Sequence, residues 1–330
     1  MIDFRYHLVS IVSIFLALAV GIVLGAGPLK GEIGATLTDE IAGLRDDKAQ
    51  LNEQLTAAQR GTESRDAYIS AANPWVLDGL LDLRTVALVV LPGVDSTLVE
   101  ATATTLGTAG ARVVSTTSLT ESWVAVDDST TSVRRAVVAR VAGAVGVDLE
   151  AFGGEVAPRD ALLAAMLTTS TEPDAPAVDT AEIDRGLQSL DDAGLLTVDT
   201  PDGAVEQAEL AVVVSGAVTT GDEEARAAAS AQWVDLSVAL ANRASATVMA
   251  AEVDPEADGV WVLTTMRDDA DAAAVVSGVD DAGEPMGQAS VVLALTEQAA
   301  GDVGQYGVAA DADDPFAPLP TPTPTTTTTP

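Results

Sequence analysis

The chain of 330 residues is 48% hydrophobic and 3% aromatic, which suffices for one large or two small domains with a sizeable core. Its formal net charge of -34, from 50 acidic and 16 basic residues, repels a phosphate backbone, so we expect no nucleic-acid partner. Cysteine is absent, which excludes disulfides, thiolate nucleophiles and cysteine metal sites.

An uncharged apolar segment lies near the N-terminus. Residues 8–26 carry no charge, and as a helix they span about 28 Å, which matches a bilayer core. A cleaved signal peptide is the alternative, because Arg5 precedes the segment and small residues follow it. The segment exceeds the usual length of a signal h-region, so we predict a retained transmembrane anchor over 8–26 that contacts membrane lipid.

The charges on the two sides of this anchor predict its orientation. Arg5 and the terminal amine lie on one side, and an acidic region that starts at Glu32 lies on the other. We therefore expect residues 1–7 to be cytoplasmic and the main domain to lie outside the membrane, in the cell envelope.

Small residues recur every four positions in the anchor, at Ala17, Gly21 and Gly25. Such a row lets two membrane helices approach backbone to backbone, which predicts packing of the anchor in a homo-oligomer. The alternative is that glycine is simply common in membrane helices.

A heptad pattern after the anchor predicts a short coiled-coil stalk over 32–71. Its seam recurs at alternating spacings of four and three residues and comprises Leu37, Ile41, Leu44, Lys48, Leu51, Leu55 and Ala58. Because the pattern lasts only about three heptads, an amphipathic helix that packs on its own domain stays open. We expect Gly61 to end or fray the helix and Pro74 to break it.

Residues 72–310 predict an α/β domain with a largely parallel, helix-covered sheet. Continuous β-branched runs at 85–91 and 111–119 flank a predicted helix over 96–107, which makes a βαβ unit. Further predicted strands lie near Leu196, Val213, Val248, Val262 and Leu293, and further predicted helices cover 180–193 and 222–244. An acidic, proline-containing stretch marks a possible subdivision near 171–178.

The chain ends in a segment rich in proline and threonine. Residues 311–330 lack hydrophobic periodicity, so we expect an extended, disordered tail.

The domain lacks the side chains of most enzyme mechanisms. His7 is the single histidine and the lysines are Lys30 and Lys48, so residues 50–330 carry no imidazole, thiol or amine side chain. This excludes Ser-His-Asp and Cys-His catalysis, Schiff-base chemistry and the P-loop lysine. We expect no enzyme activity and no catalytic residue. A hydrolase that uses only carboxylates is the remaining enzymatic alternative.

Binding motifs are equally sparse. No G-x-G-x-x-G follows the run at 85–91, so we expect no cofactor-binding residue and no cofactor. A glycine series at Gly301, Gly304 and Gly307 fits a loop better than a phosphate site. Adjacent acids fit turns and helix starts, and they occur at Asp127-Asp128, Asp191-Asp192, Glu223-Glu224, Asp268-Asp269 and Asp280-Asp281. Scattered methionines at Met166, Met249, Met266 and Met286 fit core positions, which leaves metal ligands unknown.

Several segments resemble one known family in order and spacing. They are the opening MIDFRYHLVSIVSIFLALAVGIVLGAGPL, the stalk, VALVVLPGVD, ELAVVVSGA, VSGVDDAGEPMGQASVVLAL and GDVGQYG. Together they resemble the actinobacterial copper transporter family that includes mycobacterial copper transport protein B. The resemblance covers all but the Thr-Pro tail, and it implies a part in copper homeostasis through copper efflux. No functional residue is carried over from the family.

Two functions follow as expectations. The resemblance implies a membrane-anchored envelope protein of copper transport that assists efflux, with other envelope or transport proteins as partners. The residues alone equally fit a scaffolding envelope protein that dimerises through its stalk and has no direct metal role.

Overall fold

The computed structural model describes residues 4–25, 29–149, 156–171, 178, 180–201, 203–254 and 256–320. The chain divides into two compact units between Arg65 and Asp66. The first unit holds helix α1 (Phe4–Gly25) and most of helix α2 (Leu29–Val76), and the second holds the α/β domain. An N-terminal apolar helix followed by an α/β domain is therefore confirmed.

Helix α1 is exposed along its whole length and carries no acidic residue in its first turn. Within the described ranges it alone is long and apolar enough to cross a membrane, a criterion that a signal sequence also meets. Its apolar side chains are not buried by any described part of the chain, so a bilayer is the environment that suits them.

Helix α2 is longer than the sequence predicts. It runs without interruption through Gly61, because one glycine costs a helix only about 1 kcal/mol relative to alanine. The expected end at Gly61 is therefore wrong. Pro74 lies in the last turn and the helix ends two residues later, at Val76. Asn73 Nδ2 then donates to the Pro285 carbonyl oxygen at 2.8 Å, within the second unit.

One seven-stranded sheet organises the domain. Its order is β3-β2-β1-β4-β6-β8-β9, and every neighbouring pair is parallel except β2 with β3. The strands are β1 (Thr85–Val90), β2 (Arg112–Leu119), β3 (Leu196–Asp199), β4 (Leu210–Ser215), β6 (Ala246–Ala251), β8 (Ser277–Val279) and β9 (Gln305–Tyr306). A separate antiparallel pair joins β5 (Ala217–Val218) to β7 (Val260–Trp261). Strands from before and after residues 171–178 share the main sheet, and residues 172–177 lie outside the described ranges.

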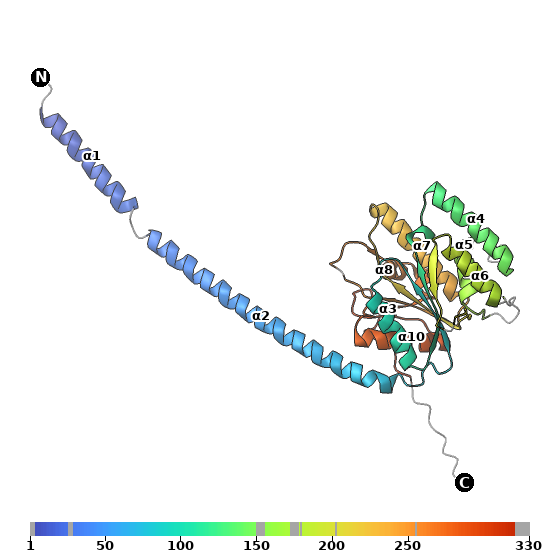
Figure 1. Cartoon of the computed structure of the whole chain (residues 1–330). Coiled ribbons are helices and arrows are strands. Elements are labelled where there is room, and N and C mark those ends of the chain that lie inside the picture. The colour runs from blue at the N-terminus through green and yellow to red at the C-terminus, as the bar shows by residue number, and fades with distance from the viewer. Residues whose placement is uncertain are drawn as a thin grey trace, which may run out of the picture. The chain divides into compact units, whose positions relative to one another are not determined.

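Helices cover both faces of this sheet (Figure 1). One face packs against α3 (Ser96–Thr108) and α10 (Pro285–Ala300). The opposite face packs against α4 (Asp128–Val145), α5 (Pro158–Leu167), α6 (Thr180–Asp191), α7 (Glu223–Ala241), α8 (Val262–Asp268) and α9 (Ala270–Ala273). A short 3₁₀ turn, η1 (Glu121–Trp123), follows β2. The largely parallel, helix-covered sheet is thereby confirmed.

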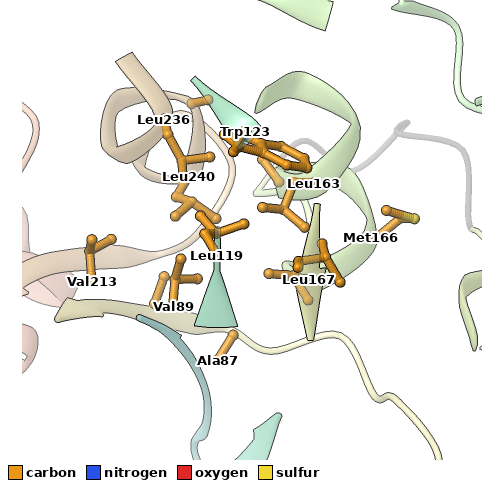
Figure 2. Close-up of a cluster of buried hydrophobic side chains, with 14 of the residues drawn as sticks. Ala87, Val89, Leu119, Trp123, Leu163, Met166, Leu167, Val213, Leu236 and Leu240 are labelled. Carbon is orange, nitrogen blue, oxygen red and sulfur yellow. The ribbon is translucent and has the colours of Figure 1, made fainter. Parts of the chain in front are cut away.

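Alternate side chains of each central strand serve the two cores. In β1, Val86 and Leu88 pack toward α3 and α10, whereas Ala87 and Val89 pack toward the other helices. This explains why the strand is continuously apolar instead of alternating. Figure 2 shows part of the core on the sheet face that α4 to α9 cover, in which Val89 lies in one cluster with Leu163 of α5 and Leu240 of α7.

Two predicted strands are helices. The run near Leu293 belongs to α10, which begins with Pro285 and ends at Ala300. Gly301 follows as the C-cap, with the left-handed φ of +111°. The run near Val262 contributes only two residues to β7 and continues as α8. A helix buried on most sides shows the same unbroken apolar run as a buried strand, so periodicity could not separate them.

The packed domain extends into the expected tail. Asp311 accepts a hydrogen bond from Arg267 at 3.0 Å, and Ala317 is fully buried. Residues 321–330, which hold every threonine of the tail, lie outside the described ranges, so their extended conformation stays a prediction.

Candidate functional site

The small residues of the anchor lie along one line of α1. Ala17, Gly21 and Gly25 are exposed, and nothing lies within 4 Å of the position that a Cβ would take at Gly21 or Gly25. The single chain therefore leaves room for a second helix against this row. Packing of two anchors stays a prediction.

The predicted seam of the stalk is exposed along α2. Its large apolar side chains range from 40% exposed at Ile41 to 68% exposed at Leu44, and Lys48 and Ala58 are also exposed. These residues lie on α2, but no second helix packs against them within the described part of the single chain. The coiled coil itself therefore stays a prediction.

A buried ion network lies at the β8 end of the sheet. Arg267 Nη1 contacts Asp280 Oδ2 at 2.8 Å and Asp311 Oδ1 at 3.0 Å, and Arg267 Nη2 donates to the Tyr306 carbonyl oxygen at 2.8 Å. Burial, and then the neighbouring Asp280 charge, raise the pKa of Asp281 to about 6. The network joins α8, β8 and the C-terminal segment, which is a structural role.

A second buried acid lies between α5 and the turn after β2. Asp160 is fully buried, and its Oδ1 accepts a hydrogen bond from Trp123 Nε1 at 2.8 Å and faces Arg159 Nε at 3.3 Å. Burial raises the pKa of Asp160 to about 6, although the Arg159 charge and the Trp123 hydrogen bond act in the opposite direction. The surroundings are apolar core, so this acid serves the fold instead of facing a substrate.

Two of the acidic pairs lie at helix starts, Asp191-Asp192 lies where α6 ends, and Asp280 belongs to the ion network. Asp127 and Asp222 are the N-caps of α4 and α7, and their side chains accept from the Thr130 and Ala225 amides. The hydrogen bonds from Ser129 and Thr130 lower the pKa of Asp127 to about 2. These positions confirm the reading of the two pairs as helix starts.

The expected core positions of the methionines can be compared with the structure. Met166, Met249 and Met266 are fully buried in the apolar core. Within the ranges that the structure describes, no three histidine, aspartate or glutamate side chains come together in a way that could hold a metal ion. The glycine series at 301–307 runs from the C-cap of α10, at Gly301, through the short strand β9. A Cβ added at Gly304 would meet Tyr306, and one added at Gly307 would meet Asp280.

A cavity of about 340 Å³ opens at the carboxyl ends of β1, β2 and β4. In the sheet, β2 lies on one side of β1 and β4 lies on its other side. The strand order therefore reverses at β1, next to the cavity. Open α/β sheets bind their ligands at such a point, because the loops diverge there and leave a crevice. The wall comprises Pro92, Gly93, Glu121, Val124, Ala125, Val126, Ala217, Val218, Thr219, Thr220, Gly221, Ala225, Ala228, Ala229, Gln232 and Trp233.

This cavity carries little of the chemistry that catalysis needs. Glu121 is the one carboxylate among the described wall residues, and Glu121 Oε1 accepts a hydrogen bond from Thr220 Oγ1 at 2.8 Å. A glycosidase-type mechanism needs two carboxyl groups across one cleft. The cavity could not be predicted from the sequence pattern, because its wall combines the loops after β1, β2 and β4, which are about 30 and 95 residues apart. The local sequence offered only turn residues, such as Pro92-Gly93 after a buried strand.

Comparisons with known proteins give one consistent match. The chain is 29% identical over 310 residues to the copper transporter MctB of Mycobacterium bovis and of Mycobacterium tuberculosis, covering 93% of this chain and 96% of each relative. It is 30% identical over 319 residues to the copper transporter MctB of Mycobacterium leprae, with the same coverage. The model of the family described as copper transport outer membrane protein, MctB, matches residues 1–317, and the chain therefore belongs to this family.

Proposed function

We propose that this chain is a membrane-anchored cell-envelope protein of copper transport and copper homeostasis, which assists efflux and is not an enzyme. The observation that carries the proposal is the extent of the family match, which includes the apolar helix and the whole sheet. Relatives named copper transporters align over 93% of the chain, so the likeness is not confined to one segment.

The proposed location follows from α1 and the charges beside it. Arg5 lies at one end of the apolar helix and acidic residues dominate beyond the other end, which favours a cytoplasmic N-terminus and an extracytoplasmic domain. Both faces of the domain's sheet are covered by helices, as in water-soluble α/β domains.

The path of the copper ion across the membrane is formed by an assembly of several chains. A single membrane helix encloses no pore, so a path for the ion requires several copies of the chain or a partner transport protein. The exposed row of small residues on α1 and the exposed seam on α2 are the surfaces that suit such assembly.

The test measures whole-cell copper in a deletion strain grown in elevated copper. We expect copper to rise and to return to the parental level when the full chain is supplied. A chain that lacks residues 1–28 is the matched control, and it should not restore the level, because it is not held at the membrane. Unchanged copper in the deletion strain contradicts the proposal.

The exposed seam on α2 favours a second candidate, a scaffold that dimerises through the stalk without a metal role. It predicts normal copper in the deletion strain but loss of an envelope assembly when the seam is disrupted. The two candidates therefore differ in the copper measurement itself.

A further inference from the structure

The cavity at the reversal of strand order is hollow because its wall residues are small. On α7, the residues Ala225, Ala228 and Ala229 face it, at the spacing that places side chains on one side of a helix. Gly93 and Gly221 have φ values of +82° and +97°, a backbone region that glycine adopts without strain. The small side chains of the loops and of one face of α7 therefore leave the cavity open.

The inner wall is apolar and rigid. Trp233 is almost fully buried and belongs to the core, and it presents an aromatic surface to the cavity. Val124 and Ala217 come from the segments that follow β2 and β4, so the wall is anchored in the sheet. A volume of about 340 Å³ lies at the lower end of the range for small-molecule pockets.

The described wall residues of the cavity carry a negative charge and no positive charge. Glu121 is exposed at the cavity, and no salt bridge to it is present among the described residues. Thr220 Oγ1 donates to its Oε1 at 2.8 Å and so holds the carboxylate in place, while the other oxygen has no protein donor within the described chain. Among the residues that the structure describes, no arginine or lysine lines the cavity.

Arg159, which contacts the wall residue Gln232, is already compensated. Arg159 Nη2 donates to Gln232 Oε1 at 3.0 Å, and the same guanidinium faces the buried Asp160. A phosphate or carboxylate ligand would thus meet Glu121 without a partner, in a chain of net charge -34. This excludes the anionic dinucleotides that many related sheet topologies hold at this position.

We propose that this cavity binds a small ligand that combines an apolar body with a positively charged amine. Glu121 pairs with the ammonium group at the mouth, and Trp233 with the alanines of α7 encloses the apolar body. The inference goes beyond the proposed function in copper transport and does not depend on it.

The experiment titrates the full chain, embedded in lipid nanodiscs, with three probes of similar shape and different charge. Phenethylamine is cationic, 2-phenylethanol is neutral and phenylacetate is anionic, and binding is measured by saturation-transfer NMR against empty nanodiscs. We expect phenethylamine to bind about tenfold or more tightly than the alcohol, since only its ammonium group forms a charge-assisted hydrogen bond with Glu121. Phenylacetate should not bind.

Two variants assign the binding to this cavity. Glu121→Gln should reduce the affinity for the amine to that for the alcohol, whereas Glu223→Gln, which removes a charge from α7 outside the wall, should not. Ala228→Leu should fill the cavity and weaken amine and alcohol alike, with Ala227→Leu on the same helix as control. Binding of none of the probes, preference for phenylacetate, or amine binding that neither wall variant changes overturns the proposal.

Discussion

Arg267 Nη1 lies 2.8 Å from Asp280 Oδ2, and only 3% and 1% of the two side chains are exposed. Asp280 Oδ1 also accepts from the Val308 amide at 2.8 Å, so the carboxylate joins β8 to the C-terminal segment. Removal of one buried partner leaves the other charge unpaired in the interior, which costs more than the intact pair contributes.

Asp280→Asn should therefore destabilise the domain strongly. We expect the free energy of unfolding to fall by about 3 kcal/mol, because the buried Arg267 then keeps only Asp311, whose side chain is 33% exposed, as a counterion. Equilibrium urea unfolding followed by circular dichroism measures the change. Glu209→Gln is the control, since it breaks the exposed pair with Arg84 and should cost less than about 1 kcal/mol. Equal losses in the two variants contradict this account.

Asp160 should make stability depend on pH. Its folded pKa of about 6 exceeds the usual aspartate pKa of 3.8, so the stability that its proton contributes is fully present below pH 3.8 and is lost as pH rises through 6. Between pH 5 and pH 7 the wild-type chain should lose about 1 kcal/mol relative to Asp160→Asn. Arg159, Asp235 and the Trp123 indole face the carboxyl and set this balance. Asp258→Asn, a change at the surface, is the control. If the free energy of unfolding of the wild type and of Asp160→Asn changes equally with pH, the prediction is contradicted.

The stalk should support self-association of the chain. In protein that lacks residues 1–28, Leu44→Asp with Leu51→Asp places charges in the seam and should reduce the mass measured by light scattering to that of one chain. Gln50→Asp with Ala57→Asp is the matched control, because it adds the same charge at positions outside the seam. A mass that the seam variant leaves unchanged indicates that the dimer, if any, forms elsewhere.

The absence of cysteine makes the topology directly measurable. Ala136→Cys, at an exposed position of α4, should react with a membrane-impermeant maleimide in cells whose inner membrane is intact. Asp3→Cys should react only after that membrane is permeabilised, because we place residues 1–7 in the cytoplasm. Labelling of Asp3→Cys in intact cells, or recovery of the full chain in the soluble fraction, contradicts the proposed anchoring.

Much of the fold was predictable, because buried parallel strands have a distinct composition. The continuous β-branched runs of β1, β2, β4 and β6 identified the centre of the sheet. The same signal misplaced α10, since Val291 to Leu295 are all buried in a helix that packs on the sheet. Helices α4 and α5 were not recognised as separate elements, because their apolar faces are short.

The candidate site was not predictable from the pattern. Glu121 and Thr220 lie 99 positions apart, and they meet only because β2 and β4 both end at the same edge of the sheet. Neither residue belongs to a motif with a fixed spacing. Their proximity depends on strand order, which local sequence does not encode.

The sequence by itself determined the apolar helix, the acidic character, the parallel α/β class and the lack of imidazole, thiol and amine chemistry in residues 50–330. These properties depend on composition and local periodicity, which any reader of the chain can count. Tertiary structure alone decided that one sheet spans both halves, that Arg267 is paired in the interior, and that a cavity with one carboxylate opens where the strand order reverses. Contacts between residues distant in sequence arise from the packing of whole elements, so they exist only once the chain has folded.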